Sequence, residues 1–274
     1  MKKSVLITGC SSGIGYYCAI ELHQAGYQVF ATTRKQDDVD KLRQQGLDAY
    51  QLDLNNSESI DKALQAILKK TDNHLDALFN NGAFGQPGAT EDLTLKAIRE
   101  QFETNVFGTL YLTNQVIKIM RLQGHGRIIQ NSSVLGFVAI PYRGAYTASK
   151  FALEALTDTL RLELTDTNIQ FSLIEPGPIL SSFRENAFVK FKENIDIKNS
   201  AHHQKYERMI NHFSKKGPAV PFTLGPEAVY KSLLHALEAK KPKVRYYVTF
   251  PTYLFGYLKR ILSFKLMDKI LAKV

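Results

Sequence analysis

A tyrosine and a lysine one helical turn apart are the residues with the clearest capacity for chemistry. Tyr146 and Lys150 form a Y-x-x-x-K pattern, and this spacing places both side chains on one face of a helix. A nearby ammonium favours the phenolate and lowers the pKa of a phenol from about 10 toward the neutral range. The pair therefore predicts a general acid/base at Tyr146. Alone the pattern is weak, because it also recurs in helices without a catalytic role.

Two polar residues upstream are candidates for the same reaction centre. Ser133 ends an expected strand over 127–133, so its hydroxyl can hydrogen-bond a carbonyl or alcohol oxygen at that point. Strand alternation points its neighbour Ser132 the other way. Asn105 is expected inside a long helix over 94–122, where an amide does not favour helix formation. Its side chain either bonds a backbone carbonyl or holds a water that links Lys150 to solvent.

A glycine-rich turn, TGCSSGIG at 8–15, follows the first expected strand. Gly9 permits a tight turn, Gly13 lets the backbone approach a pyrophosphate, and Gly15 allows close contact between helix and strand. The N–H groups at the start of the next helix attract phosphates. The spacing is G-x-x-x-G-x-G, which is also compatible with a purely structural turn. The candidate phosphate-binding residues are Gly9, Ser11, Ser12, Gly13, Ile14 and Gly15.

The end of the second expected strand, ATTRK at 31–35, favours NADP(H) over NAD(H). Thr33 stands where an acidic residue would hydrogen-bond the ribose 2′-OH of NAD. Arg34 and Lys35 follow at once, and a guanidinium suits a 2′-phosphate. Alternatively, both cations are solvated loop charges. Asp53, at the end of the third expected strand, either accepts from an adenine amino group or caps the next turn.

The elements that must position these residues alternate between strands and helices. Strands are expected over 4–8, 27–33, 48–54, 75–80, 127–133, 169–175 and 243–248, and helices over 14–25, from an N-cap at Ser57 through Leu68, and over 94–122, 145–164 and 226–239. This order predicts an α/β fold, a single-domain, doubly wound parallel sheet of the Rossmann type flanked by helices. The domain is expected over 1–250. Within it, the polar segment 181–225 lacks a strong core face and is placed to cover a ligand as a lid. An amphipathic C-terminal helix is expected in the tail, 251–274.

Composition excludes several classes of protein. The chain has 274 residues, of which 44% are hydrophobic and 22% charged, so a disordered chain is excluded. Tyr246 to Leu258 is too short to span a membrane, and the start, MKKSVLITGC, shows no cleavage pattern. Two cysteines fit a reducing compartment, so a cytoplasmic location is expected. The net charge is +9, but nucleic-acid binding is not expected, since no arginine-rich stripe with interleaved aromatics is present.

Two further features leave alternatives open. The stretch 253–274 carries five basic residues and one acidic residue among apolar ones. It therefore either contacts an anionic membrane peripherally or packs on its own domain or on a partner subunit, and packing is favoured. His202, His203 and His212 lie in the lid, where solvated or substrate-lining histidines are favoured over a metal site. No metal is expected.

In combination, these motifs resemble the short-chain dehydrogenase/reductase family over residues 3–250. The matching segments are TGCSSGIG, LDL with Asp53, FNNGA at 79–83, Asn105, Ser133 with Tyr146 and Lys150, and EPGPI at 175–179. The resemblance implies a nicotinamide cofactor, a tetrad of Asn105, Ser133, Tyr146 and Lys150, and a bond from Lys150 to the nicotinamide ribose. It further implies cofactor contacts from Leu54, Asn80, Pro176, Gly177, Ile179 and Ser181. Two departures, NNGA for the usual NNAG and Ser181 for the usual threonine, leave the chemistry intact.

The branch is similar to hydroxysteroid and retinol dehydrogenases and to related bacterial reductases. This implies an NADP(H)-dependent oxidoreductase that interconverts a carbonyl and an alcohol on a lipophilic small molecule. Tyr146 is expected to protonate the developing alkoxide and Ser133 to stabilise its charge. A homo-oligomer is expected through the helices that end at Leu122 and Leu164. The alternative is a nucleotide-sensing, NADP-binding regulatory module; a sugar-nucleotide epimerase is disfavoured because those relatives use a different glycine spacing and a longer C-terminal domain.

Overall fold

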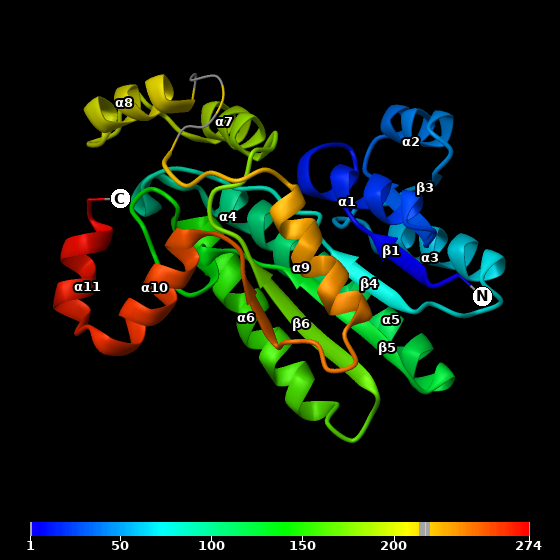
Figure 1. Cartoon of the computed structure of the whole chain (residues 1–274). Helices are drawn as coiled ribbons and strands as arrows, with labels where there is room; N and C mark the ends of the chain where they lie inside the picture. Colours follow the sequence, from blue (N-terminus) through cyan, green and yellow to red (C-terminus); the bar gives the residue numbers. More distant parts are fainter. Residues whose placement is uncertain (1, 214–216, 218–219, 274) are drawn as a thin grey trace.

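A computed structural model describes residues 2–213, 217 and 220–273 (Figure 1). Within these residues, seven parallel strands form one sheet in the order β3-β2-β1-β4-β5-β6-β7. Their bounds are β1 (Ser4–Ile7), β2 (Gln28–Thr33), β3 (Asp48–Gln51), β4 (Ala77–Asn80), β5 (Gly126–Asn131), β6 (Ile169–Glu175) and β7 (Arg245–Tyr247). The doubly wound α/β fold is thus confirmed. Because the strand order reverses between β1 and β4, the carboxyl ends of these two strands border the crevice where such sheets bind ligands.

Helices cover both faces of the sheet. One layer contains α1 (Gly13–Gln24), α2 (Gln36–Gln44) and α9 (Glu227–Glu238), and the other contains α3 (Ser57–Lys70), α5 (Thr109–Gln123) and α6 (Gly144–Glu163). Strand alternation explains the two cores: Val5 and Ile7 pack with α1 and α9, whereas Leu6 packs with α3 and α5. Apolar residues of β1 are buried on both sides, as expected for a central parallel strand.

Several boundaries differ from the prediction. The N-cap of α3 is Asn56, whose side chain accepts from the Ser59 N–H, and Ser57 is the first helical residue. The expected long helix over 94–122 is interrupted: α4 (Leu95–Phe102) leads into a π-helical segment, η2 (Glu103–Gly108), before α5 begins. Such segments often mark functional sites, and this one contains Asn105. Two short 3₁₀ turns, η1 (Thr90–Asp92) and η3 (Val134–Gly136), complete the loops beside it.

The described part of the lid segment contains helices that its polar sequence did not predict. It contains α7 (Phe183–Asn194) and α8 (His203–Phe213), which lie together at one end of the molecule (Figure 1). Phe191, Ile195 and Tyr206 bury a small separate core against Ala89 and Ala145. The core face was missed because its apolar residues come from two helices and lack one continuous period.

The tail forms two helices, α10 (Phe250–Ile261) and α11 (Phe264–Leu271), instead of the single helix expected. Leu262 and Ser263 adopt extended backbone angles, which end the first helix. Met267 and Leu271 pack on Val138, so the favoured prediction of packing on the chain's own domain is confirmed. No described helix is long and apolar enough to cross a bilayer.

Candidate active site

The glycine turn joins β1 to α1 through two residues with left-handed backbones. Gly9 has φ +73° and Gly13 has φ +59°, conformations that side chains beyond glycine rarely adopt. A Cβ at Gly13 would lie 2.8 Å from the Cβ of Ser181, and a Cβ at Gly15 would lie 2.3 Å from the Gly9 carbonyl oxygen. The turn therefore meets the segment after β6, which brings together two groups of residues predicted to bind the cofactor.

The start of α1 is arranged as an anion site would be. Ser12 is the N-cap residue and forms no side-chain capping bond with any described residue, so the first N–H groups remain for an outside acceptor. Ser11 is exposed, whereas Ile14 packs partly against the core. Ile14 can therefore offer only its backbone to a ligand.

The cations at the end of β2 are available to a ligand. Arg34 and Lys35 are exposed, and no carboxylate in the described part of the chain forms an ion pair with either of them. Thr33 is buried and its hydroxyl donates to the Lys35 carbonyl at 3.0 Å, while Gln51 donates to the Arg34 carbonyl at 3.1 Å. These bonds fix the loop and leave both cationic side chains free.

Asp53 caps a turn, which is one of its two predicted roles. Its Oδ1 atom accepts from the Asn55 N–H at 3.0 Å; its role toward adenine stays a prediction. Leu54 packs close to two glycines, since its Cδ1 atom would lie 3.2 Å from a Cβ at Gly82 and its carbonyl oxygen 1.8 Å from one at Gly108.

The asparagine that reaches the glycine turn is the one after the residue we predicted. Asn80 is buried and donates to the Thr113 hydroxyl at 2.8 Å, on the side of α5. Asn81 instead donates to the carbonyls of Thr8 and Gly9 and accepts from Asn131 at 2.8 Å. Because successive side chains of an extended strand point to opposite sides, alternation at the end of β4 could have distinguished Asn80 from Asn81.

Tyr146 and Lys150 lie one turn apart on α6 and are both buried, 8% and 3% exposed. The Lys150 ammonium donates to the Asn131 carbonyl at 2.7 Å and lies 5.8 Å from the centroid of the Tyr146 ring. We expected the neighbouring ammonium to lower the pKa of Tyr146, and this prediction was wrong. Burial raises the pKa of Tyr146 to about 12, and a hydrogen bond from Ser133 opposes this rise only in part. Burial also lowers the pKa of Lys150 to about 8, against the influence of the Glu154 carboxylate.

Both pKa shifts arise from desolvation. Removing water costs the charged phenolate and the charged ammonium more free energy than it costs their neutral forms. Ser133 is 9% exposed, caps η3 by accepting from the Leu135 N–H, and bonds the phenol. Ser133, Tyr146 and Lys150 thus form one buried group. At neutral pH the phenol carries its proton, which suits it to act as an acid.

Asn105 positions the backbone beside this group. Its amide donates to the Phe84 carbonyl at 3.0 Å and accepts from the Phe84 N–H at 3.2 Å. It also donates to the Ser149 hydroxyl, which in turn donates to the Tyr146 carbonyl at 2.7 Å. One predicted role of Asn105, a bond to a backbone carbonyl, is thus present. Its other predicted role, holding a relay water, stays a prediction.

The segment after β6 lies against the catalytic group. The Val134 N–H donates to the Pro176 carbonyl at 2.8 Å, and a Cβ at Gly177 would lie 2.2 Å from the Thr249 hydroxyl. Ile179 pairs with Leu224 in a β-bridge. Pro176, Gly177, Ile179 and Ser181 therefore run from η3 to the glycine turn.

Phe183, the first residue of α7, covers Tyr146. The two ring centroids lie 5.2 Å apart with an interplanar angle of 62°, the edge-to-face geometry favoured by aromatic pairs. Gly85 faces this pair, because a Cβ there would lie 2.8 Å from the Phe183 ring. The lid thus contributes an aromatic surface directly above the candidate acid.

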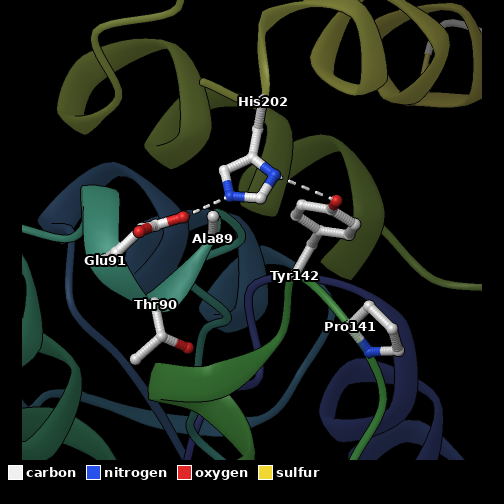
Figure 2. A pocket seen from close by; sticks show the side chains of 6 residues that line it. All are labelled: Ala89, Thr90, Glu91, Pro141, Tyr142 and His202. Atoms are coloured by element: carbon white, nitrogen blue, oxygen red, sulfur yellow. Dashed lines mark hydrogen bonds and ion pairs between the residues drawn. The ribbon is translucent and has the colours of Figure 1, made fainter. Parts of the chain in front are cut away.

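A pocket of about 380 Å³ lies between the lid and the loops below it (Figure 2). His202 bridges these parts, with Nδ1 3.2 Å from the Tyr142 hydroxyl and Nε2 2.5 Å from a Glu91 oxygen. Tyr146 and Ser133 do not line this pocket. Of the other lid histidines, His203 is exposed, and the side chain of His212 lies outside the described residues.

The comparisons with known proteins agree with this geometry. The model of the short chain dehydrogenase family matches residues 3–190. The chain is 43% identical over 271 residues to the uncharacterized oxidoreductase YbbO of Escherichia coli, covering 99% of this chain and 94% of that one. It is 32% identical over 260 residues to human 17-beta-hydroxysteroid dehydrogenase type 1, covering 90% of this chain and 78% of that one.

Solved structures show the same fold. A short-chain dehydrogenase from Burkholderia phymatum in complex with NAD has a TM-score of 0.79 at 23% identity, covering 98% of this chain and 95% of that one. An actinorhodin polyketide ketoreductase with NADPH has a TM-score of 0.73 at 25% identity, covering 90% and 95%.

Proposed function

The chain belongs to the short-chain dehydrogenase family, and we propose that this oxidoreductase uses NADP(H) to interconvert a carbonyl and an alcohol on a lipophilic substrate. The proposal rests on the buried group of Ser133, Tyr146 and Lys150, which lies just after the carboxyl end of β5 and at the start of α6. A phenol, a hydroxyl and an ammonium are brought together there from separate elements, next to the glycine turn.

The residues around the glycine turn fit a dinucleotide. A Cβ at Gly9 would lie 2.7 Å from the Gly82 backbone, so this turn leaves room only for backbone. The uncapped start of α1 suits a pyrophosphate. The Arg34 guanidinium forms no ion pair with any residue that the structure describes, and position 33 holds no acidic residue; both features support NADP(H) over NAD(H). When bound, the reduced nicotinamide supplies the hydride.

The chain's own residues would handle the oxygen and its proton. Ser133 donates a hydrogen bond to the carbonyl oxygen, which becomes more negative as the reaction proceeds. Tyr146 then donates its phenolic proton to the alkoxide, and its high pKa keeps that proton in place until this moment. Lys150, tethered to the Asn131 carbonyl, places a positive charge behind the phenol and stabilises the phenolate that forms.

Apolar side chains support a lipophilic substrate. Phe183 covers Tyr146, and the Leu180 N–H donates to the Leu224 carbonyl at 2.8 Å. Phe222 packs against Phe250, with ring centroids 4.9 Å apart and an interplanar angle of 41°. The side chains of Leu180, Phe183, Phe222, Leu224 and Phe250 are exposed, and together they form an apolar rim from the lid to the start of α10.

Exposed residues of the tail support peripheral contact of residues 253–274 with an anionic membrane. The inner face of the tail packs on the domain, whereas Tyr257, Ile261 and Phe264 remain exposed. Exposed cations flank them at Arg260, Lys265, Lys269 and Lys273, and each adds about 1 kcal/mol of attraction to anionic lipid. The Lys259 ammonium instead donates to the Phe137 carbonyl of the domain. Sedimentation with phosphatidylglycerol vesicles is expected, and the double variant I261S/F264S should lose it while Leu95→Ser, at an exposed leucine of α4, keeps it. Equal sedimentation of both variants, or none of the wild type, contradicts the membrane contact.

A second copy of the chain is expected on α5 and α6. A shallow surface groove there is lined by residues including Tyr111, Ile117 and Leu160, and Leu122 and Leu162 are exposed nearby. Light scattering after size exclusion tests this expectation directly.

The buried, free thiols of Cys10 and Cys18 are consistent with the reducing compartment, the cytoplasm, that we propose.

The test of the function is oxidation of NADPH with a panel of steroids, retinoids and aliphatic or aromatic aldehydes. Turnover with at least one lipophilic carbonyl, and alcohol formed in equal amount, is the expected result. NADPH binding without turnover across the panel would favour the alternative, a nucleotide-sensing regulatory module. That alternative gives no reason for the chain to keep the Tyr146 and Lys150 pair.

A further inference from the structure

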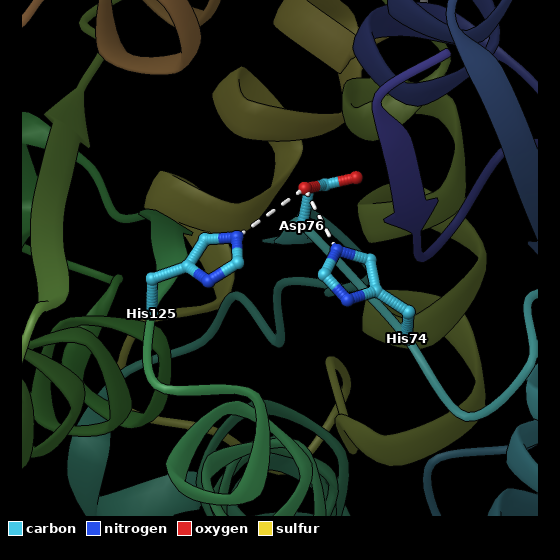
Figure 3. Close-up of side chains that lie close together, drawn as sticks. All are labelled: His74, Asp76 and His125. Atoms are coloured by element: carbon cyan, nitrogen blue, oxygen red, sulfur yellow. Dashed lines mark hydrogen bonds and ion pairs between the residues drawn. The ribbon is translucent and has the colours of Figure 1, made fainter. Parts of the chain in front are cut away.

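Two histidines and an aspartate converge at the end of the sheet opposite the catalytic group. His74 and Asp76 precede β4, and His125 precedes β5 (Figure 3). One potential ligand atom from each of the three lies within 4.8 Å of the others. The residues come from two loops about fifty positions apart in the chain, so only the fold brings them together.

The distances suit a small transition-metal ion. His74 Nε2 lies 3.0 Å and His125 Nε2 lies 3.7 Å from the same oxygen, Asp76 Oδ1. Tetrahedral zinc with bonds of about 2.0–2.1 Å needs ligand atoms about 3.3–3.4 Å apart. Changes of a few tenths of an ångström would bring both nitrogen–oxygen distances to this spacing.

The other ring nitrogen of His125 fixes which nitrogen faces Asp76. His125 Nδ1 lies 3.2 Å from the Gln123 carbonyl, and because a carbonyl only accepts, Nδ1 carries the proton. In the neutral ring the Nε2 lone pair then points toward a carboxylate oxygen, which is repulsive unless a cation lies between them. Metal-binding histidines use this same bond to a backbone carbonyl.

The second oxygen of Asp76 is held as well. Asp76 Oδ2 accepts from the Ser4 N–H at 2.7 Å and from the Ser4 hydroxyl at 2.9 Å. These bonds orient the carboxylate and leave Oδ1 for the two histidines. Such outer contacts are typical of carboxylates that bind metals.

Gln123 ties the two loops together. Its Oε1 atom accepts from the Leu75 N–H at 3.0 Å, and its Nε2 atom donates to the carbonyls of Leu75 and His125 at 2.8 and 2.7 Å. Leu75 lies between two of the candidate ligands. The backbone positions of all three ligands are thus set before any ion arrives.

We propose that His74, Asp76 and His125 form a binding site for a divalent transition-metal ion, zinc foremost, with water completing the coordination. Two imidazoles and one carboxylate are donors that zinc accepts, whereas calcium and magnesium prefer oxygen alone. The site links the starts of β4 and β5 and lies away from Tyr146, so its ion stabilises the sheet and takes no part in the reaction.

The competing account is a protonated His125 in an exposed ion pair with Asp76. Titration calorimetry of the full-length chain with zinc chloride at neutral pH separates the two. We expect one ion per chain, and His74→Ala or His125→Ala should each weaken binding at least about ten-fold. His23→Ala, which removes an exposed histidine at the end of α1, is the matched control and should leave binding unchanged.

A second readout guards against a folding artefact. Zinc should raise the unfolding temperature of the wild type and of His23→Ala, but not that of the double variant H74A/H125A. Circular dichroism of the three proteins without zinc should be the same, since both ligand histidines are exposed or half-buried. Absence of zinc binding by the wild type, or equal affinity in the double variant, overturns the proposal.

Discussion

The catalytic crevice and the surface formed by lid and tail lie side by side, yet their side chains are buried to opposite degrees. Asn105 and Lys150 are 1% and 3% exposed, and each donates a hydrogen bond to a backbone carbonyl. Phe222 and Phe264 are 58% and 89% exposed. The first region is polar and fixed, whereas the second is apolar and open. Chemistry and substrate choice are therefore separate properties of these two regions, so substitutions in them should change different kinetic constants.

Among substitutions around the acid Tyr146, the largest effect is expected at the oxygen that develops charge. Ser133→Ala removes a hydrogen-bond donor from that oxygen and should lower kcat/KM about 10²–10³-fold. Ser132→Ala is the matched control, because Ser132 is equally buried but turned toward Gly136. Steady-state kinetics with NADPH and a reactive aldehyde measure both variants. Equal losses at the two serines would show that the effect comes from packing.

A smaller effect is expected at the cofactor's edge. Arg34→Ala removes a charged hydrogen bond to the 2′-phosphate, worth about 1.5–3 kcal/mol, so the Kd for NADPH should rise about 10–100-fold. The Kd for NADH, which lacks this phosphate, should stay within about two-fold. Fluorescence titration with each nucleotide tests this. A parallel loss for both nucleotides would contradict the assignment of Arg34.

The pH profile tests the charge behind the phenol. Burial lowers the pKa of Lys150 to about 8, so its ammonium is charged below that pH and neutral above it. If the charge assists Tyr146, kcat/KM for reduction should hold below pH 8 and fall about ten-fold for each unit above it. A profile that stays level well into the alkaline range would remove this role from Lys150.

The smallest effect belongs to the lid. Phe183→Ala removes an apolar surface over Tyr146, worth about 1–2 kcal/mol to a lipophilic substrate. KM for such a substrate should rise several-fold, while KM for a small polar aldehyde and kcat for both stay nearly constant. A fall in kcat of the same size would join the lid to the chemistry and end the separation of the two regions.

Sequence reasoning succeeded where a motif requires a particular backbone. The glycine turn needed left-handed residues at Gly9 and Gly13, and the Y-x-x-x-K pattern needed one helical face, so both predictions of placement held. The alternating order of strands and helices was enough to predict the parallel sheet.

It failed where tertiary contacts decide. The π-helical break at Asn105 depends on bonds to Phe84, a residue from another loop. The rise in the pKa of Tyr146 depends on burial that no spacing reveals. The lid helices depend on a core shared among Phe191, Tyr206 and Ala89, which lie far apart in the chain.

The central claim is that the Tyr146 phenol donates the proton that completes carbonyl reduction. The most direct measurement is the single-turnover rate of NADPH oxidation by Tyr146→Phe with a substrate that the wild type reduces, alongside the Kd for NADPH. We predict a rate lowered about 10²–10⁴-fold at an unchanged Kd. A rate close to that of the wild type, with NADPH bound equally well, would contradict the account.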